Sequence, residues 1–253
     1  HERLKTILDT LPEKQKEVVL LHIVEKKKIK EHQKALEGRI TRLLRPMQEL
    51  TPEEQEKSIH DFILELGKTL SEEEYDHPSE EVWIAKSATV APTAYIHGPA
   101  IIGKESEIRH CAFIRGSAII GKNCVIGNST EVKNSIIFDE VQIPHYNYVG
   151  DSILGFRSHL GAGAITSNVK NDKSNVEVNF ALGKMDTKLR KFGAIVGDFS
   201  QIGCNSVLNP GTIIGRNCSI YPLSNVRGLV NENSIYKAPG KVVQKVKLKK
   251  DPK

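Results

Sequence analysis

The sequence predicts a mainly β fold, a parallel β-helix built from six-residue repeats and preceded by a small α-helical segment. Two observations predict it. From about Trp83 to about Val230 an apolar residue recurs every six positions, and a small residue often follows it at the fourth place. Before residue 80 the chain is instead charged, glycine-poor and helical in period. We therefore expect a helical segment over 1–80, a β-helix domain over 81–245 and a basic tail over 246–253.

The helical segment carries start signals for its helices. We expect one helix to about Leu36 behind a Thr10/Glu13 capping box, one over Arg39–Leu50, and one from Pro52 behind Thr51. The third should bury Ile59, Phe62, Ile63, Leu66 and Leu70. We interpret the stretch from Asp76 to Ser79 as a linker. The segment contains no chemical motif, so we interpret it as a packing or oligomerisation element.

The six-residue series defines the β-helix. Its apolar members are Ile84, Val90, Ile96, Ile102, Ile108, Ile114, Ile120, Ile126 and Val132, then Val196, Ile202, Leu208, Ile214, Ile220 and Val226. Each hexapeptide is one short strand, three strands make a triangular coil of eighteen residues, and the coils stack. The apolar residue should fill the interior. The small residue should sit at the corner, where glycine relieves backbone strain.

The repeat breaks between Val132 and Val196. Ile137 comes five positions after Val132 rather than six, and the polar, basic stretch over 167–191 cannot be threaded as coils. We interpret this stretch as an inserted loop. A loop of this length is usually functional or disordered.

Residues eighteen apart should lie above one another, roughly 4.8 Å apart. His97, Arg115 and Lys133 form such a column, which places two cations side by side. An anion such as phosphate would relieve their repulsion. Alternatively, both side chains splay into solvent and pair with nearby acids such as Glu131.

Composition and charge constrain the setting. The net charge of +5 lies largely in Lys26–Lys30 and the C-terminal tail, runs that we interpret as solvated rather than as a nucleic-acid site. No apolar span or signal-peptide pattern is present, which predicts a cytoplasmic protein without membrane contact. The four cysteines lack metal or disulfide spacing. Cys124 and Cys218 fit the small corner positions better than nucleophilic roles.

The segment over 127–173 contains three motifs, EVKN, PHYNYVGD and LGAGAITSN, which follow one another along the chain in this order. It resembles the acetyltransferase half of the bifunctional glucosamine-1-phosphate acetyltransferase and N-acetylglucosamine-1-phosphate uridyltransferase family, including its archaeal members. The resemblance extends more weakly from about Ala94 to about Lys245. It implies a left-handed β-helix, a homotrimer, and acetyl transfer from acetyl-CoA to an amino-sugar 1-phosphate. Residues 1–80 resemble no nucleotidyltransferase domain.

The resemblance also implies roles for individual residues. His145 becomes the general base that deprotonates the acceptor amine, a task suited to an imidazole; otherwise it is a turn histidine after Pro144. The implied substrate-binding residues are Arg115, Lys133, Tyr148, His159 and Asn168, and those lining the acetyl-CoA site are Ala162, Cys204 and Pro222. Backbone N–H groups near Gly161 to Gly163 could stabilise the oxyanion.

The chain departs from the family at His159, Ala164, Cys204 and Pro222, where asparagine, threonine, serine and alanine are usual. These departures leave open a second function, a scaffold or regulatory protein that binds sugar phosphate without coenzyme A. A third, a zinc hydratase sharing this architecture, needs three histidines around the metal. Its paired His-x4-His spacing is absent, and His110, His145 and His159 are spaced otherwise, so no metal is expected.

Overall fold

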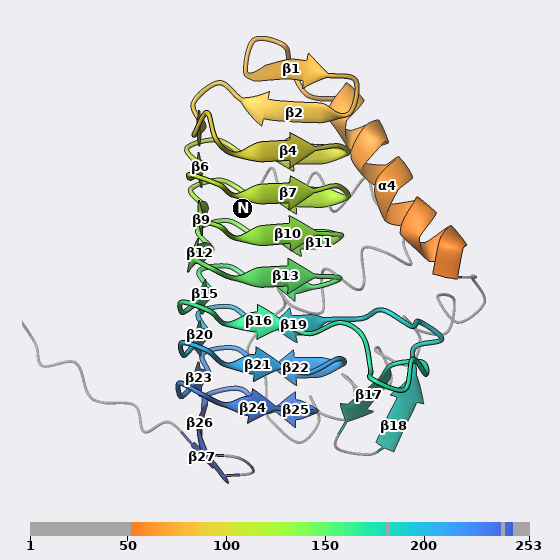
Figure 1. Ribbon diagram of the computed structural model, residues 1–253, viewed down its shortest axis with the longest axis vertical. Coiled ribbons are helices and arrows are strands. Elements are labelled where there is room, and N and C mark those ends of the chain that lie inside the picture. The colour runs from red at the N-terminus through yellow and green to blue at the C-terminus, as the bar shows by residue number, and fades with distance from the viewer. Residues whose placement is uncertain (1–51, 181–182, 239–240, 245–253) are drawn as a thin grey trace, which may run out of the picture.

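The computed structural model describes residues 52–180, 183–238 and 241–244, which form a three-walled parallel β-helix with one helix beside it (Figure 1). The predicted mainly β class is confirmed. The helices expected before Pro52 and the basic tail over 246–253 lie outside the described residues. The described helix, α4 (Pro52–Lys68), is too short and too polar to cross a membrane.

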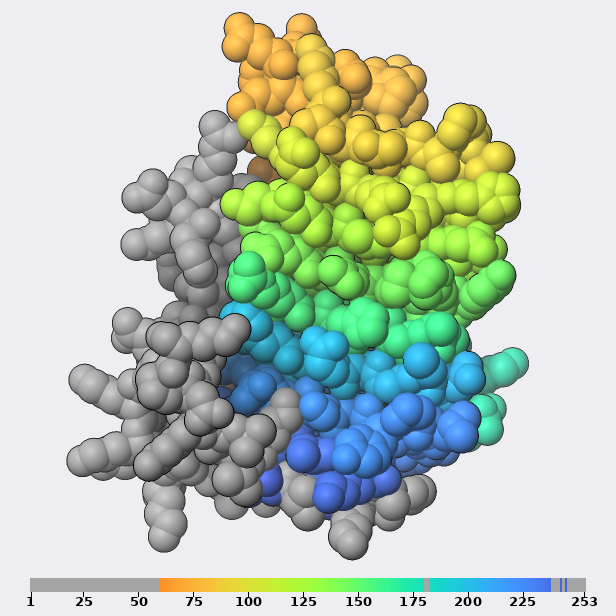
Figure 2. All heavy atoms as spheres, turned by 90° about the vertical axis from the view of Figure 1, so that its left-hand side faces the viewer, coloured from red at the N-terminus to blue at the C-terminus, as the bar shows by residue number. Residues whose placement is uncertain are grey.

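Each wall is one sheet, and the chain visits the walls in a fixed order. Wall 1 contains β1 (Tyr75–Ser79), β2 (Val82–Ala85), β5 (Ala100–Ile102), β8 (Ala118–Ile120), β11 (Ser135–Ile137), β14 (Ile153–Leu154), β19 (Ala194–Val196), β22 (Thr212–Ile214) and β25 (Leu229–Val230). Wall 2 contains β3 (Thr89–Val90), β6 (Glu107–Ile108), β9 (Val125–Asn128), β12 (Gln142–His145), β15 (His159–Leu160), β20 (Gln201–Ile202), β23 (Ser219–Ile220), β26 (Ser234–Ala238) and β27 (Lys241–Gln244). Wall 3 contains β4 (Tyr95–His97), β7 (Phe113–Arg115), β10 (Glu131–Lys133), β13 (Tyr148–Gly150), β16 (Ile165–Thr166), β21 (Val207–Leu208) and β24 (Asn225–Val226). Figure 2 looks at the wall-2 side, where the coils stack as bands in chain order.

The predicted apolar series forms the interior. Its members from Ile102 to Val132 and from Val196 to Val226 are at most 3% exposed and pack as one cluster, with Ile84, Val90 and Ile96 partly buried at the first coils. The small residues, including Ala112, Cys124 and Cys218, are also buried. The expectation that both cysteines are small interior residues is therefore confirmed.

Glycine relieves backbone strain at only a few corners, such as Gly163, so its expected role is wrong for most of the repeat. The left-handed backbone positions between wall 2 and wall 3 hold Cys111, Ser129, Tyr146, Gly163, Asn205 and Leu223, with φ from 52° to 71°. The recurrent glycines that follow the apolar position have no such φ, namely Gly103, Gly121, Gly127, Gly197, Gly203 and Gly215. They are needed because a Cβ would strike the neighbouring coil: at Gly127 it would lie 1.6 Å from the Pro144 carbonyl oxygen.

The register slip has a simple form. Val132 pairs with Ile114, eighteen positions before it, but with Val149 only seventeen after it. The stretch over 167–191 leaves the coils, as predicted. It folds as a hairpin of β17 (Glu177–Phe180) and β18 (Gly183–Asp186), closed at its base by a Val169–Lys191 bridge, with Val176 and Val178 buried.

Helix α4 packs on the outer side of wall 1 at the first coils (Figure 1). Ile63 and Leu66 are buried against Trp83 and Ile101, as predicted from the helical period. The linker expected over Asp76–Ser79 is wrong, because these residues lie in β1. That strand runs antiparallel to β2 and caps the exposed edge of the first coil.

Candidate functional site

Four of the predicted site residues lie on the outer side of wall 3. Arg115 ends β7 and Lys133 ends β10, so that they occupy the same position on adjacent rungs, as the column predicted. Tyr148 begins β13 on the next rung, and Asn168 follows β16. The fold therefore brings these four residues to one stretch of wall, which we call the wall-3 cluster.

Asp151, which was not predicted, is the centre of this cluster. Its carboxylate lies 3.5 Å from the Lys133 Nζ, and the two side chains are only 7% and 9% exposed. The amides of Asn134 (2.7 Å) and Asn168 both donate to it. Lys133 thus neutralises the charge of one buried carboxylate and two amides donate hydrogen bonds to it, which is the condition under which a charge is tolerated out of water.

Tyr148 is tied to the same group. Its hydroxyl accepts a hydrogen bond of 3.1 Å from the Asn168 amide. Burial raises the pKa of Tyr148, and the nearby Asp151 carboxylate adds to the effect. Gly150 leaves room for this arrangement, since a Cβ there would lie 2.5 Å from the Tyr148 hydroxyl. The phenol is therefore a neutral hydrogen-bonding group at physiological pH.

The two stacked cations already have partners. Arg115 Nη1 lies 2.7 Å from Glu131 Oε1, with the arginine half exposed, and Lys133 is buried beside Asp151. The alternative in which Arg115 pairs with Glu131 is therefore confirmed, but Lys133 does not splay into solvent. Two acids balance two cations, so no anion is needed to relieve the column.

His145 lies at the corner between wall 2 and wall 3. Its side chain is exposed and makes no hydrogen bond or ion pair with any described residue. Its backbone is held on both sides: the N–H donates to Asn147 Oδ1 (3.0 Å), and the carbonyl accepts from the Gly163 N–H (3.0 Å). The imidazole is thus free to meet a ligand while its backbone is fixed.

Ala162, Cys204 and Pro222 follow His145 in one column, one on each successive rung toward the C-terminal coils. Gln142 pairs with His159, and Leu160 with Ile202 and then Ile202 with Ile220, which places these residues on successive rungs. We call His145, Ala162, Cys204 and Pro222 the corner column. Cys204 and Pro222 are exposed, and Ala162 is partly so.

Among the expected oxyanion donors, two are already used. The Gly161 N–H donates to the Ile202 carbonyl (2.7 Å) and the Gly163 N–H to the His145 carbonyl. The Ala162 N–H donates to no described residue. A single free donor therefore lies one rung from the His145 side chain.

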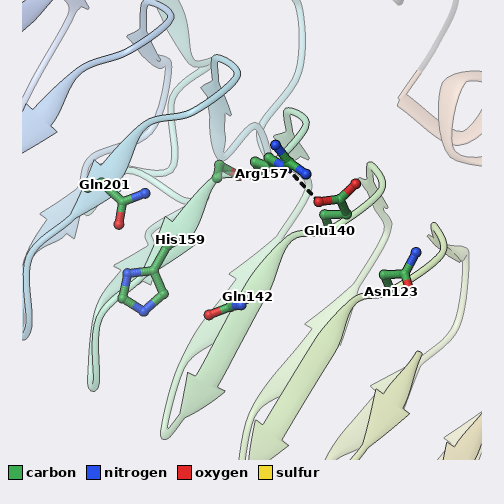
Figure 3. Close-up of a pocket in the computed structure, with 7 residues that line it drawn as sticks. Asn123, Glu140, Gln142, Arg157, His159 and Gln201 are labelled. Carbon is green, nitrogen blue, oxygen red and sulfur yellow. Dashed lines mark hydrogen bonds and ion pairs between the residues drawn. The ribbon is translucent and has the colours of Figure 1, made fainter. Parts of the chain in front are cut away.

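His159 lies elsewhere, on the outer side of wall 2. It lines a shallow groove with Gln142 and Gln201 on the neighbouring rungs, and an Arg157–Glu140 ion pair of 2.5 Å forms its side (Figure 3). Within one chain, then, His159 does not join the wall-3 cluster. No group of three metal-ligating side chains occurs in the described part of the chain.

Two family models match successive parts of the β-helix. A family model described as the GMPPB C-terminal domain matches residues 96–182, and one described as bacterial transferase hexapeptide (six repeats) matches residues 193–228. The bifunctional protein GlmU of Methanococcus maripaludis is 40% identical over 125 residues, 47% of this chain and 29% of that protein.

Two further relatives carry related names. A bifunctional sugar-1-phosphate nucleotidylyltransferase/acetyltransferase of Sulfurisphaera tokodaii is 36% identical over 44% of this chain and 28% of its own length. The uncharacterized acetyltransferase YaiX of Escherichia coli is 34% identical over 58% of this chain and 64% of its own length. The chain therefore spans under a third of the archaeal relatives it matches.

Proposed function

We propose, from the premise that this β-helix is a GlmU-like hexapeptide-repeat domain, that the protein transfers an acetyl group from acetyl-CoA to the amine of an amino-sugar 1-phosphate such as glucosamine 1-phosphate. One observation carries the proposal. The unpartnered His145 imidazole lies one rung from the free Ala162 N–H, so a general base and an oxyanion donor occupy the same corner.

The chemistry follows from these two groups. His145 accepts a proton from the neutral acceptor amine as its nitrogen attacks the thioester carbonyl carbon. The Ala162 N–H donates to the oxygen as it becomes an oxyanion, which lowers the barrier where charge develops. The carbon–sulfur bond then breaks, and the coenzyme A thiolate leaves with a proton returned from the imidazolium. Acetyl-CoA would run along Ala162, Cys204 and Pro222, which line the same corner.

The wall-3 cluster would hold the sugar phosphate. Arg115 is half exposed and can exchange Glu131 for a phosphate, because an arginine fork binds both anions in the same way. Tyr148 and Asn168 supply neutral hydrogen bonds to sugar hydroxyls. Lys133 adds positive potential but stays tied to Asp151.

His159 supports a further element of the proposal. It lies on wall 2, so it could reach an acceptor held on wall 3 only from a second copy of the chain. A homotrimer with sites between neighbouring β-helices would satisfy this requirement. We also propose a cytoplasmic location, where acetyl-CoA and sugar phosphates occur, with neither nucleic acid nor membrane as a partner.

The test is loss of the imidazole. His145→Ala should reduce acetyl transfer to glucosamine 1-phosphate by about 100-fold or more, the range of a lost general base, measured as free thiol release from acetyl-CoA. His110→Ala is the matched control. His110 is exposed on the same corner two coils earlier and bonds Thr93 rather than a ligand. Equal turnover in His145→Ala and wild type would overturn the assignment of the base.

A second candidate is a scaffold or regulatory protein that binds sugar phosphate without coenzyme A. It is favoured by Pro222, which replaces a smaller residue and lacks an N–H on the corner column. Calorimetry separates the two candidates. Binding of acetyl-CoA supports the transferase, whereas binding of sugar phosphate alone supports the scaffold.

A further inference from the structure

Asn147 is larger than the other residues of the buried column in which it lies. The register places Ala112, Thr130, Asn147, Ala164, Ser206 and Ser224 on successive rungs of one buried corner. The other members are alanine, serine or threonine, as a tight corner requires. Asn147 is larger, yet it is only 3% exposed. A buried amide in a column of small residues needs a compensating set of hydrogen bonds.

All the bonds made by its amide group end on the backbone around His145. The nitrogen donates to the Gly161 carbonyl (2.8 Å) and to the Ala164 carbonyl (2.9 Å), which uses both of its hydrogens. The oxygen accepts from the His145 N–H (3.0 Å). One side chain therefore joins the His145 rung to the Gly161–Ala164 turn of the next rung.

The same turn closes a second connection. Its Gly163 N–H donates to the His145 carbonyl, so the peptide groups on both sides of the His145 Cα are held, one by Asn147 and one by a turn that Asn147 fixes. The turn also carries the free Ala162 N–H. Asn147 thus sets the spacing between the imidazole and that donor.

The imidazole has no other support. It is exposed and makes no hydrogen bond with any residue in the described part of the chain, so its direction depends on the backbone that carries it. Misplacing a reacting group by about 1 Å can cost roughly 100-fold in rate.

We propose that Asn147 is a positioning residue that holds His145 and the Ala162 N–H at their working separation. This inference rests on the proposed function for its consequence in turnover, although the geometry that it describes does not require catalysis. Serine at this position, as at Ser206, fits the column but is too short to reach the His145 N–H and both carbonyls together.

The experiment compares Asn147→Ser with Asn209→Ser. Asn209 is a matched control, because it is also buried (7% exposed) and donates to a backbone carbonyl of the next coil, that of Val226 (2.8 Å), but touches no residue of the corner column. We expect the two variants to lose similar thermal stability. Only Asn147→Ser should lower kcat, by about 10- to 100-fold, with KM for both substrates and the midpoint of the pH–rate profile unchanged.

Nuclear magnetic resonance of the His145 ring gives a readout without activity. The Cε1–H signal should be single and narrow in the wild type and in Asn209→Ser, and broadened or doubled in Asn147→Ser. If Asn147→Ser does not fold, Asn147→Thr, which repeats the residue of the preceding rung, replaces it. An unchanged His145 signal, or a kcat loss no larger than in Asn209→Ser, overturns the inference. Absence of acetyl transfer in the wild type would overturn the proposed function alone.

Discussion

The Lys133–Asp151 ion pair on wall 3 and the Arg157–Glu140 ion pair on wall 2 lie on the same scaffold, but they differ in burial. The side chains of Lys133 and Asp151 are 9% and 7% exposed, and two asparagine amides also donate hydrogen bonds to the Asp151 carboxylate. Arg157 and Glu140 are 55% and 32% exposed, and the arginine also lies over the Phe156 ring. Removing one partner of the buried pair leaves the other as an uncompensated charge out of water, which is costly. Removing one partner of the exposed pair costs little, because water solvates the charge that is left.

The largest effect should come from breaking the buried pair. Asp151→Ala leaves the Lys133 ammonium without its acid and removes one hydrogen-bond acceptor from each of two amides, so we expect a loss of about 3 kcal/mol in the free energy of unfolding. Urea denaturation measures it. Adding Lys133→Met should recover part of the loss, because the unpaired charge is then removed. No recovery in the double variant would show that the cost lies in the amides rather than the charge.

An intermediate effect should follow from Tyr148→Phe, which removes the hydrogen bond with Asn168 and should cost about 1 kcal/mol. The raised pKa of Tyr148 gives this tyrosine a signature in pH. The folded state holds the phenolic proton of Tyr148 more tightly than the unfolded state does. The resulting contribution of Tyr148 to the free energy of unfolding is therefore complete below the pKa of an unfolded tyrosine, and it is lost as the pH rises through the pKa of the folded state. Ultraviolet titration above about pH 10 should show one late-ionising tyrosine that is absent from the variant.

The smallest effect should come from the exposed pair. Arg157→Ala should change the free energy of unfolding by less than about 1 kcal/mol, the usual range for exposed pairs. High salt should reduce the difference between this variant and the wild type. If Arg157→Ala lost as much free energy of unfolding as Asp151→Ala, the expected difference between the exposed and the buried ion pair would be contradicted.

The candidate site was only partly predictable from the sequence. Spacing alone predicted that Arg115 and Lys133 share a column, and the resemblance named Tyr148, Asn168 and His145. Asp151 was missed, although it lies in the PHYNYVGD stretch, because nothing in the local sequence indicates that an aspartate after a glycine is buried. Asn147 was missed for a related reason: its importance lies in three backbone partners, which no local pattern reveals.

The sequence by itself determined the coil. A six-residue apolar period can be satisfied only by short strands that turn at fixed intervals, and the interior of the β-helix follows from it residue by residue. The tertiary structure decided which charges meet. The coil that pairs Val132 with Val149 is one residue shorter than eighteen, a slip that the spacing from Val132 to Ile137 already indicated, so Gly150, not Asp151, lies beside Lys133. That slip places the carboxylate at the corner, where Asn134, Asn168 and Lys133 converge on it. Such convergence depends on register between distant segments, because hydrogen bonds and ion pairs act over a few ångströms.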